Sequence, residues 1–192
     1  MLMILRGVRY LRQRGIIATV IAIFFFINRK IKHHLIPIYY EKGVRETAKT
    51  IGSNLNIHGK AIVNERTAFG DNVHIGGLEV SGNGSLKIGD NFHCGGHCRI
   101  YTQHHNYDKG DAIPYDNTFI VKDIIIEDNV WLGSEVTILP GSVIKEGAVI
   151  QNGSTVVDHI PKGAVAGGHP AKVFKKRDMD HYERLKSEGK FH

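Results

Sequence analysis

The most constraining feature of this chain is a six-residue repeat of branched aliphatic residues that runs from Ile120 to Val156. Every sixth position carries one: Ile120, Ile126, Leu132, Ile138, Ile144, Ile150 and Val156. A second row, four places after each of these, holds small or apolar residues: Ile124, Val130, Val136, Ser142, Ala148, Ser154 and Ile160. An α-helix with about 3.6 residues per turn would spread this period over all its faces, and a single strand of this length is out of range. The period therefore predicts an all-β solenoid of triangular coils, about 18 residues each, with both rows inside.

The same repeat begins earlier, so the solenoid is expected over residues 51–170. Two further blocks keep the spacing of six: Ile57, Val63, Phe69 and Ile75, and then Ile88, Cys94 and Ile100. One extra residue around Gly82–Gly84 separates the blocks, which predicts a bulged turn. Between residues 101 and 118 the repeat gives way to a polar stretch, which must leave the prism because the repeat resumes directly after it. Long loops on rigid scaffolds often carry function, so we place the chemistry here.

Composition limits the class and the partners of the protein. With 192 residues and 22 glycines, the chain suits one domain rich in tight turns, with an appendage. Residues 1–40 hold seven of the 25 Lys and Arg and no acid, which leaves 18 cations against 19 acids elsewhere. This distribution argues against a nucleic-acid-binding face on the solenoid and favours an anionic membrane surface near the N-terminus. Cys94 and Cys98 are interpreted as reduced residues of the wall or core, which indicates the cytoplasm.

The N-terminal arm, residues 1–50, contains a short apolar run at residues 16–27 between two groups of cations. As a helix this run is about 18 Å long, against a bilayer hydrocarbon core of about 30 Å. We expect an interfacial helix on the inner face of the cell membrane, or else a helix that packs on the prism or on a neighbouring subunit. Pro37 is expected to end the arm, and a short polar helix is expected over residues 41–50.

The C-terminal segment, residues 171–192, has a different character. Lys172, Lys175, Lys176 and Arg177 open it, and residues 178–190 predict a charged helix. Met179, Tyr182 and Leu185 lie on one face of that helix. We expect it to cap the open end of the prism, because a solenoid needs a cap to stay soluble.

Two stretches carry a resemblance to a known family. Residues 126–141 read Ile-Glu-Asp-Asn-Val-Trp-Leu-Gly-Ser-Glu-Val-Thr-Ile-Leu-Pro-Gly, and residues 166–172 read Ala-Gly-Gly-His-Pro-Ala-Lys. Together they resemble the hexapeptide-repeat acyltransferases, in particular the galactoside and maltose O-acetyltransferase branch, over about residues 51–177. The resemblance implies a left-handed parallel β-helix, an exception to the right-handed crossover rule, assembled as a homotrimer with active sites between prisms. It also implies transfer of an acetyl group from acetyl-CoA to a hydroxyl without an acyl-enzyme.

The resemblance places the family's catalytic histidine on His105, and His104 is then its neighbour. A sugar hydroxyl is a poor nucleophile, so its attack on a thioester needs a base, and an imidazole titrates near neutral pH. The family binds the tetrahedral oxyanion with the backbone N–H of the residue that is Ser134 here. Without the resemblance, His105 is one loop histidine among the 12 of the chain.

The cofactor residues also come from the resemblance. Asn152 matches a pantetheine contact, and Lys172 and Lys175 match basic positions that face the nucleotide phosphates. The alternative for these lysines is a solvated tail, and the alternative for Trp131, which would line the same groove, is packing between subunits. Residues 157–159 read Val-Asp-His where relatives often carry Thr-Lys-Asp, so a cation is missing there.

Two other functional classes remain as alternatives. A γ-class carbonic anhydrase-like enzyme would use His93, Cys94, His97 and Cys98 as zinc ligands. The hexad spacing already explains these four residues as wall positions, and the His-x-x-x-x-His pair of that class is absent among His93, His97, His104 and His105. We therefore expect no metal. The third class is a non-catalytic scaffold, which would not bind CoA.

One difference from the galactoside enzymes bears on the identity of the acceptor. The galactoside enzymes carry an acidic residue at the position that corresponds to Asn83, so their acceptor is not carried over. Together with the basic arm, this favours a lipid-linked saccharide of cell-surface polysaccharide synthesis. The identity of the sugar, and an acyl group other than acetyl, stay open.

Overall fold

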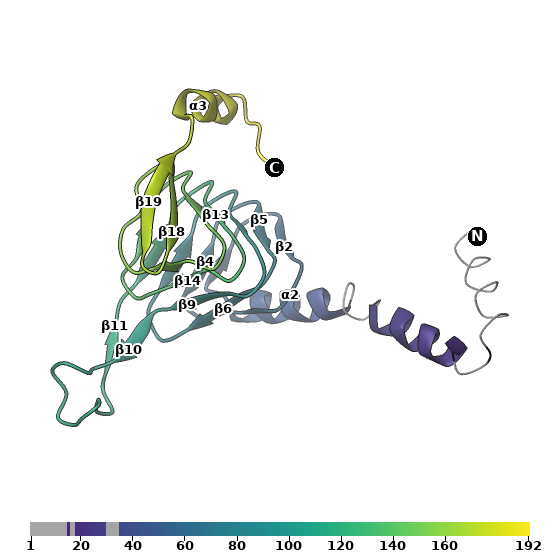
Figure 1. Cartoon of the computed structure of the whole chain (residues 1–192), viewed down its shortest axis with the longest axis horizontal. Coiled ribbons are helices and arrows are strands. Elements are labelled where there is room, and N and C mark those ends of the chain that lie inside the picture. The colour runs from purple at the N-terminus through teal and green to yellow at the C-terminus, as the bar shows by residue number, and fades with distance from the viewer. Residues whose placement is uncertain (1–14, 16–17, 30–34) are drawn as a thin grey trace.

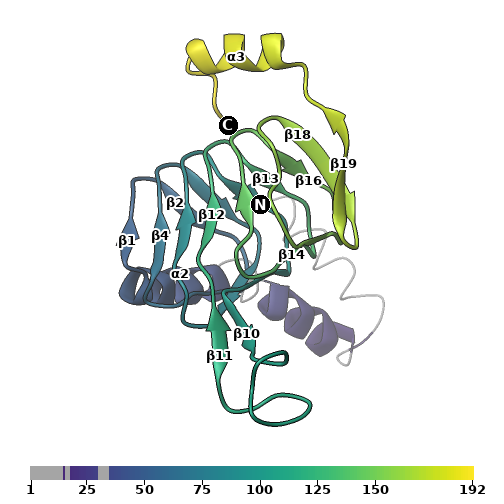
Figure 2. The same ribbon diagram turned by 90° about the vertical axis from the view of Figure 1, so that its left-hand side faces the viewer.

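The computed structural model describes residues 15, 18–29 and 35–192, which form a parallel β-solenoid of about six coils with helices at both ends of the chain (Figures 1 and 2). Each coil runs through three faces, here called A, B and C. Face A holds β1 (Thr50–Ile51), β4 (Thr67–Phe69), β7 (Leu86–Ile88), β12 (Ile124–Ile126) and β15 (Val143–Ile144). Face B holds β2 (Leu55–Ile57), β5 (Val73–Ile75), β8 (His93–Cys94), β13 (Trp131–Leu132), β16 (Val149–Ile150), β18 (Ala164–Gly168) and β19 (Ala171–Lys176). Face C holds β3 (Ala61–Ile62), β6 (Leu78–Ser81), β9 (Cys98–Tyr101), β14 (Thr137–Ile138) and β17 (Thr155–Val156).

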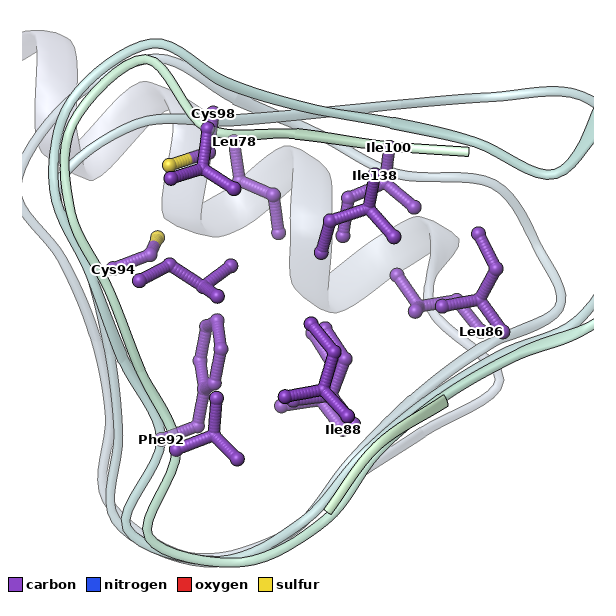
Figure 3. Packing of buried hydrophobic residues seen from close by; sticks show 14 of the residues in the cluster. Leu78, Leu86, Ile88, Phe92, Cys94, Cys98, Ile100 and Ile138 are labelled. Atoms are coloured by element: carbon purple, nitrogen blue, oxygen red, sulfur yellow. The ribbon is translucent and has the colours of Figure 1, made fainter. Parts of the chain in front are cut away.

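The two predicted rows do fill the core of the prism. Ile126, Leu132 and Ile138 are fully buried, and Figure 3 shows Ile138 stacked on Ile100 at one wall of the triangle, with Ile88 pointing inward from another. Stacking of equivalent positions follows from the register, which pairs Ile126 with Ile88 and with Ile144. The expected fold class, a solenoid of the left-handed parallel β-helix type, is confirmed.

One member of the predicted row was placed wrongly. Ile120 lies in β11 (Phe119–Val121), which pairs antiparallel with β10 (Gln103–His105) in a hairpin outside the prism. Its side chain is only half-buried, opposite His104. The hexad count continues by chance into the hairpin, because the prism resumes with Ile124 in β12.

The turns between faces A and B, here called edge AB, explain why the coils stack in register. Asn54, Asn72, Asn91 and Asn129 occupy the left-handed region there, with φ between 52° and 59°. Asparagine tolerates this region better than other non-glycine residues. The side-chain amides bond from coil to coil, for example Asn91 Nδ2 to Asn129 Oδ1 at 3.0 Å, so each turn aligns the next. Edge BC and edge CA are named in the same way.

The N-terminal arm is helical over residues 18–29 and again in α2 (Ile36–Thr47). The expectation that Pro37 ends the arm was wrong, because Pro37 lies in the first turn of α2, where its missing N–H costs nothing. Val44 buries its side chain at the N-terminal end of the core, and α2 contacts β2 and β3. Residues 1–14, 16–17 and 30–34, including part of the predicted apolar run, lie outside the described residues. No helix in the described part is long and apolar enough to cross a membrane.

The C-terminal segment first extends face B, since β19 pairs antiparallel with β18, and then forms α3 (Met179–Ser187). The side chain of Asp178 caps α3 by accepting from the His181 N–H. Tyr182, the buried residue of α3, donates its hydroxyl to Glu146 at 2.9 Å. The helix therefore covers the edge of the last coils, beside Glu146 and Gly147.

Candidate active site

The hairpin of β10 and β11 projects from edge CA, between β9 on face C and β12 on face A (Figure 1). His105 lies opposite Phe119 in this hairpin. Its ring stacks on Tyr115 at 3.9 Å and lies 4.6 Å from the ring of Phe119. Its Nδ1 is buried and has no hydrogen-bond partner among the described residues. The imidazole is thus held between aromatic rings, and a partner for Nδ1 must come from outside this chain segment.

His104 differs from His105 in its bonding. Nδ1 of His104 lies 2.8 Å from the backbone oxygen of His105, and since a carbonyl oxygen only accepts, the proton is on Nδ1. Its Nε2 is then free to accept a proton. Gln103, two residues before His105, accepts the Asn83 N–H at 2.9 Å. This contact fixes the base of the hairpin to the Gly82–Gly84 turn, the region expected to meet the acceptor.

Ser134 lies on edge BC, in the turn between β13 and β14. Its Oγ accepts the N–H of Gly96 in the preceding coil at 3.2 Å, and its carbonyl accepts the Gly153 N–H of the following coil at 2.8 Å. Asn152, which belongs to the following coil, lies directly against Gly133. The Ser134 N–H itself makes no hydrogen bond within the part of the chain that the structure describes.

On edge AB the equivalent turn N–H is paired in the first three coils but not at Asp128, which lies in the same coil as Ser134 and whose N–H makes no hydrogen bond within the described residues. The Asp71 N–H donates to Asp90 Oδ1 at 2.7 Å, and the Asp90 N–H donates to Asp128 Oδ1 at 2.9 Å. In each case the side chain of the next coil satisfies the turn N–H. At Ser134 the corresponding side chain is Asn152, and no hydrogen bond joins the two. Edge BC therefore presents a backbone donor that is available to a ligand.

The predicted cofactor residues fall into two groups. Lys172 pairs with Gly167 next to the edge BC turn, so it lies on the same edge as Ser134 and Asn152. Trp131 and Lys175 instead lie in one row across face B, because Trp131 pairs with Val149, Val149 with Val165, and Val165 with Lys175. Trp131 is 56% exposed.

Asp158 belongs to the Val-Asp-His segment, where the sequence departs from the family pattern, and it is influenced by the charge of Lys172. Hydrogen bonds from His159 lower the pKa of Asp158, and the charge of Lys172 lowers it further. The Asp158 carboxylate therefore offsets part of the positive potential around Lys172.

His105 and Ser134 do not meet within one chain. The hairpin leaves the prism at edge CA, whereas Ser134 lies on edge BC, and the whole of face C separates the two edges. The predicted base and the predicted oxyanion donor therefore lie on different edges of one prism.

The alternative zinc ligands do not converge. Cys94 and Cys98 are buried thiols of the core, whereas His97 is exposed in the turn between them. The nearby Cys98 thiol, followed by burial, raises the pKa of Cys94. No group of three or more His, Cys, Asp or Glu side chains in the described residues is arranged to hold a metal ion.

A stack of histidines on face B was missed at the level of sequence. The rings of His74 and His93 are parallel and 4.4 Å apart, and His58 continues the stack at 6.0 Å from His74. His192 packs edge-on against both His74 and His93. Burial, followed by the neighbouring imidazoles, lowers the pKa of His74, and burial lowers that of His93. The register, with His74 directly beside His93, was the available signal.

The last residues of the chain close a cleft of about 500 Å³ over Trp131. Besides Trp131 and His93, its lining includes Tyr182, Lys190 and Phe191. The Asn72 amide donates to the backbone oxygen of His192 at 2.8 Å, which holds the segment 188–192, here called the C-terminal tail, against face B.

Comparison with known proteins matches this fold and these motifs to one family. Residues 123–158 match the model described as "Bacterial transferase hexapeptide (six repeats)". WbbJ of Escherichia coli K12, provisionally named a lipopolysaccharide biosynthesis O-acetyl transferase, is 31% identical over 66% of this chain and 66% of its own length. The galactoside O-acetyltransferase of Escherichia coli K12 is 29% identical over 74% of this chain and 72% of its own. The chain spans 58% of the length of a third curated relative, YJL218W of Saccharomyces cerevisiae.

Solved structures agree. A galactoside acetyltransferase in complex with coenzyme A has a TM-score of 0.59 and 25% identity, over 73% of this chain and 72% of that one. The hexapeptide-repeat acetyltransferase VCA0836 of Vibrio cholerae, complexed with acetyl coenzyme A, shares the fold with a TM-score of 0.61 at 24% identity, over 77% and 81% of the two chains. The chain belongs to the hexapeptide-repeat acyltransferases.

Proposed function

We propose that this protein transfers an acetyl group from acetyl-CoA to a hydroxyl of a saccharide. The observation that carries the proposal is the free Ser134 N–H on edge BC, in a turn whose Trp-Leu-Gly-Ser sequence matches the family. A preorganised backbone donor is what the oxyanion of acyl transfer requires. Relatives named as galactoside O-acetyltransferase, and solved relatives with bound CoA, support the donor and the reaction class.

In the proposed reaction, the imidazole of His105 removes the proton of the acceptor hydroxyl. The hydroxyl oxygen attacks the thioester carbonyl, and the Ser134 N–H binds the oxyanion of the tetrahedral intermediate. When the carbon–sulfur bond breaks, the imidazolium returns the proton to the leaving thiolate, so that CoA and the acetyl ester are released. Asn152, Lys172 and Lys175 hold the cofactor, and Trp131 lines the groove.

The separation of His105 from Ser134 supports an active site built by two copies, and we propose a homotrimer in which each hairpin reaches edge BC of a neighbour. The buried Nδ1 of His105 lacks a partner among the described residues, and a second chain or the acceptor can supply one. His104 is the specific alternative for the base, because its Nδ1–H is already fixed by a carbonyl oxygen.

The acceptor is proposed to be a saccharide of cell-surface polysaccharide synthesis, carried on a lipid. The name of WbbJ associates a relative with lipopolysaccharide biosynthesis. Seven cations and no acid in residues 1–40 favour an anionic membrane, so we place the protein on the cytoplasmic face of the cell membrane.

A panel of hydroxyl acceptors with acetyl-CoA, assayed with and without membranes, tests this function, together with titration calorimetry of CoA. We expect CoA binding and release of free thiol with at least one saccharide. A protein that does not bind CoA would leave the scaffold alternative in its place.

A further inference from the structure

The outer surface of α2 departs from the pattern of a solvent-facing helix. Its inner face is set by Tyr40 and Val44, which pack at the N-terminal end of the core. On the outer face, the N-cap residue Leu35 and the helix residues Ile38 and Tyr39 are 60%, 64% and 73% exposed. An amphipathic surface helix normally carries polar residues there.

The charges of α2 do not compensate for this apolar surface, because they pair within the helix. Arg45 bonds Glu41 at 2.8 Å, and Lys42 lies 3.7 Å from Glu46. The preceding helical stretch, residues 18–29, exposes further large apolar side chains, among them Val20, Phe24 and Phe25. Both described helical segments of the arm therefore expose large apolar side chains.

We propose that the protein stands on an anionic phospholipid bilayer through Ile38 and Tyr39 of α2 and its N-cap residue Leu35, with the coils rising away from the lipid. A bilayer is the occupant that fits, because the exposed side chains are large and apolar and the flanking sequence is cationic without acids. A side-on arrangement would instead put one face of the prism on the lipid.

The height of the reaction centre follows from the strand order. On face B, β13 is three strands from β2, and Ser134 comes directly after β13. Three spacings of about 4.8 Å and the roughly 10 Å diameter of α2 place Ser134 about 25 Å above the lipid-facing side of α2. Together with the proposed function, on which this step rests, the height selects lipid-linked acceptors whose target sugar lies well above the headgroups.

The single tryptophan of the chain, Trp131, allows a direct test of the orientation. His74, His93, Trp131 and Val149 follow one another in register on face B, so these positions mark increasing distance from α2 along the prism axis. Energy transfer to dansyl-labelled lipid is measured in vesicles of equimolar phosphatidylcholine and phosphatidylglycerol. The native chain is compared with Trp131→Phe chains that carry His74→Trp or Val149→Trp. Transfer should fall from position 74 to 131 to 149.

Ile125→Trp in the Trp131→Phe chain is the matched control, because Ile125 lies in the same coil as Trp131 but on face A. Its transfer should equal that of the native chain. Energy transfer that depends on the face that carries the tryptophan, and not on its coil, would overturn the end-on orientation. The comparison can be made with any two of these chains that fold. Ile38→Asp should weaken vesicle binding about tenfold, whereas Phe191→Asp, in the C-terminal tail beside Trp131 on face B, should not. Equal vesicle binding of the two variants would show that α2 does not contact the lipid.

The acceptor consequence is tested with one sugar presented in three ways: free, at headgroup level, and on a spacer of about 25 Å in the same vesicles. Vesicle-bound protein should acetylate the sugar on the long spacer and not the sugar at headgroup level. Equal rates on both lipid-linked forms would overturn the inferred height and leave the proposed function intact. Failure on all three forms would instead count against the proposed function, while the energy-transfer result would stand on its own.

Discussion

Replacing Ser134 with proline should remove the proposed oxyanion donor while leaving the turn in place. Proline has no backbone N–H, and the N–H that it would remove has no acceptor in the described structure. The turn can accept it, because Glu135 after Ser134 has φ +63°, as Gly141 after Pro140 has φ +88° in the next turn of the solenoid. A proline before a residue of positive φ is the ordinary arrangement of a type II turn.

The expected loss follows from what each atom of Ser134 does. Removing one oxyanion donor costs about 2.7 to 4 kcal/mol of transition-state stabilisation, or roughly 10² to 10³ in kcat. The Oγ bond to the Gly96 N–H is lost as well, at a cost to stability of about 1 kcal/mol. Asn152 is exposed and can turn away from the ring.

Ser134→Ala is the matched control, because it removes the same Oγ and keeps the N–H. Steady-state acetyl transfer and CoA calorimetry are measured on both variants, with thermal denaturation as the check on folding. We expect the loss in kcat only for proline, with CoA affinity nearly unchanged in both. A folded proline variant with the kcat of the alanine variant would refute the assignment of the oxyanion donor.

Three further predictions concern the base, the tail and the arm. His105→Asn should lower the transfer rate by roughly 10² to 10⁴ with little change in CoA affinity, and His104→Asn much less; the opposite order would move the base to His104. Because packing lowers the pKa of His74 and His93, the docked tail is most stable above about pH 6.5 and loses stability as the pH falls below it. Emission of Trp131 should therefore change on acidification in the native chain and not in a His74→Gln, His93→Gln chain; the same change in both would argue against these histidines. Deleting residues 1–40 should abolish salt-sensitive vesicle binding, and a truncated protein that still floats with vesicles would locate the anchor elsewhere.

The sequence was sufficient for the prism because its period is a property of every coil. Leu132 and Ile138 are buried because each strand puts the same hexad position inside. The period was no guide outside the prism, and so Ile120 was assigned to the core although it belongs to the hairpin. The start of α2 was also missed, because proline was read as a stop and not as a first-turn residue.

The candidate site was likewise predictable from the sequence only in part. Ser134, Asn152 and Lys172 came from motif and resemblance, and the structure brings them to one edge. That His105 lies on another edge depends on where the hairpin leaves the prism, which no local pattern contains. The contacts of His192 with His74 and His93 join residues about 100 positions apart, and only the folded chain reveals them.

The central claim, a site shared between two copies, is tested most directly by mixing two inactive chains. The His105→Asn chain keeps an intact Ser134, and the Ser134→Pro chain keeps an intact His105. If they are denatured together and reassembled in equal amounts, about one interface in four joins an intact His105 to an intact Ser134. We therefore predict recovery of about a quarter of the native transfer rate, because assembly is random. A mixture that stays as inactive as its components, although the chains co-assemble, would contradict the shared site.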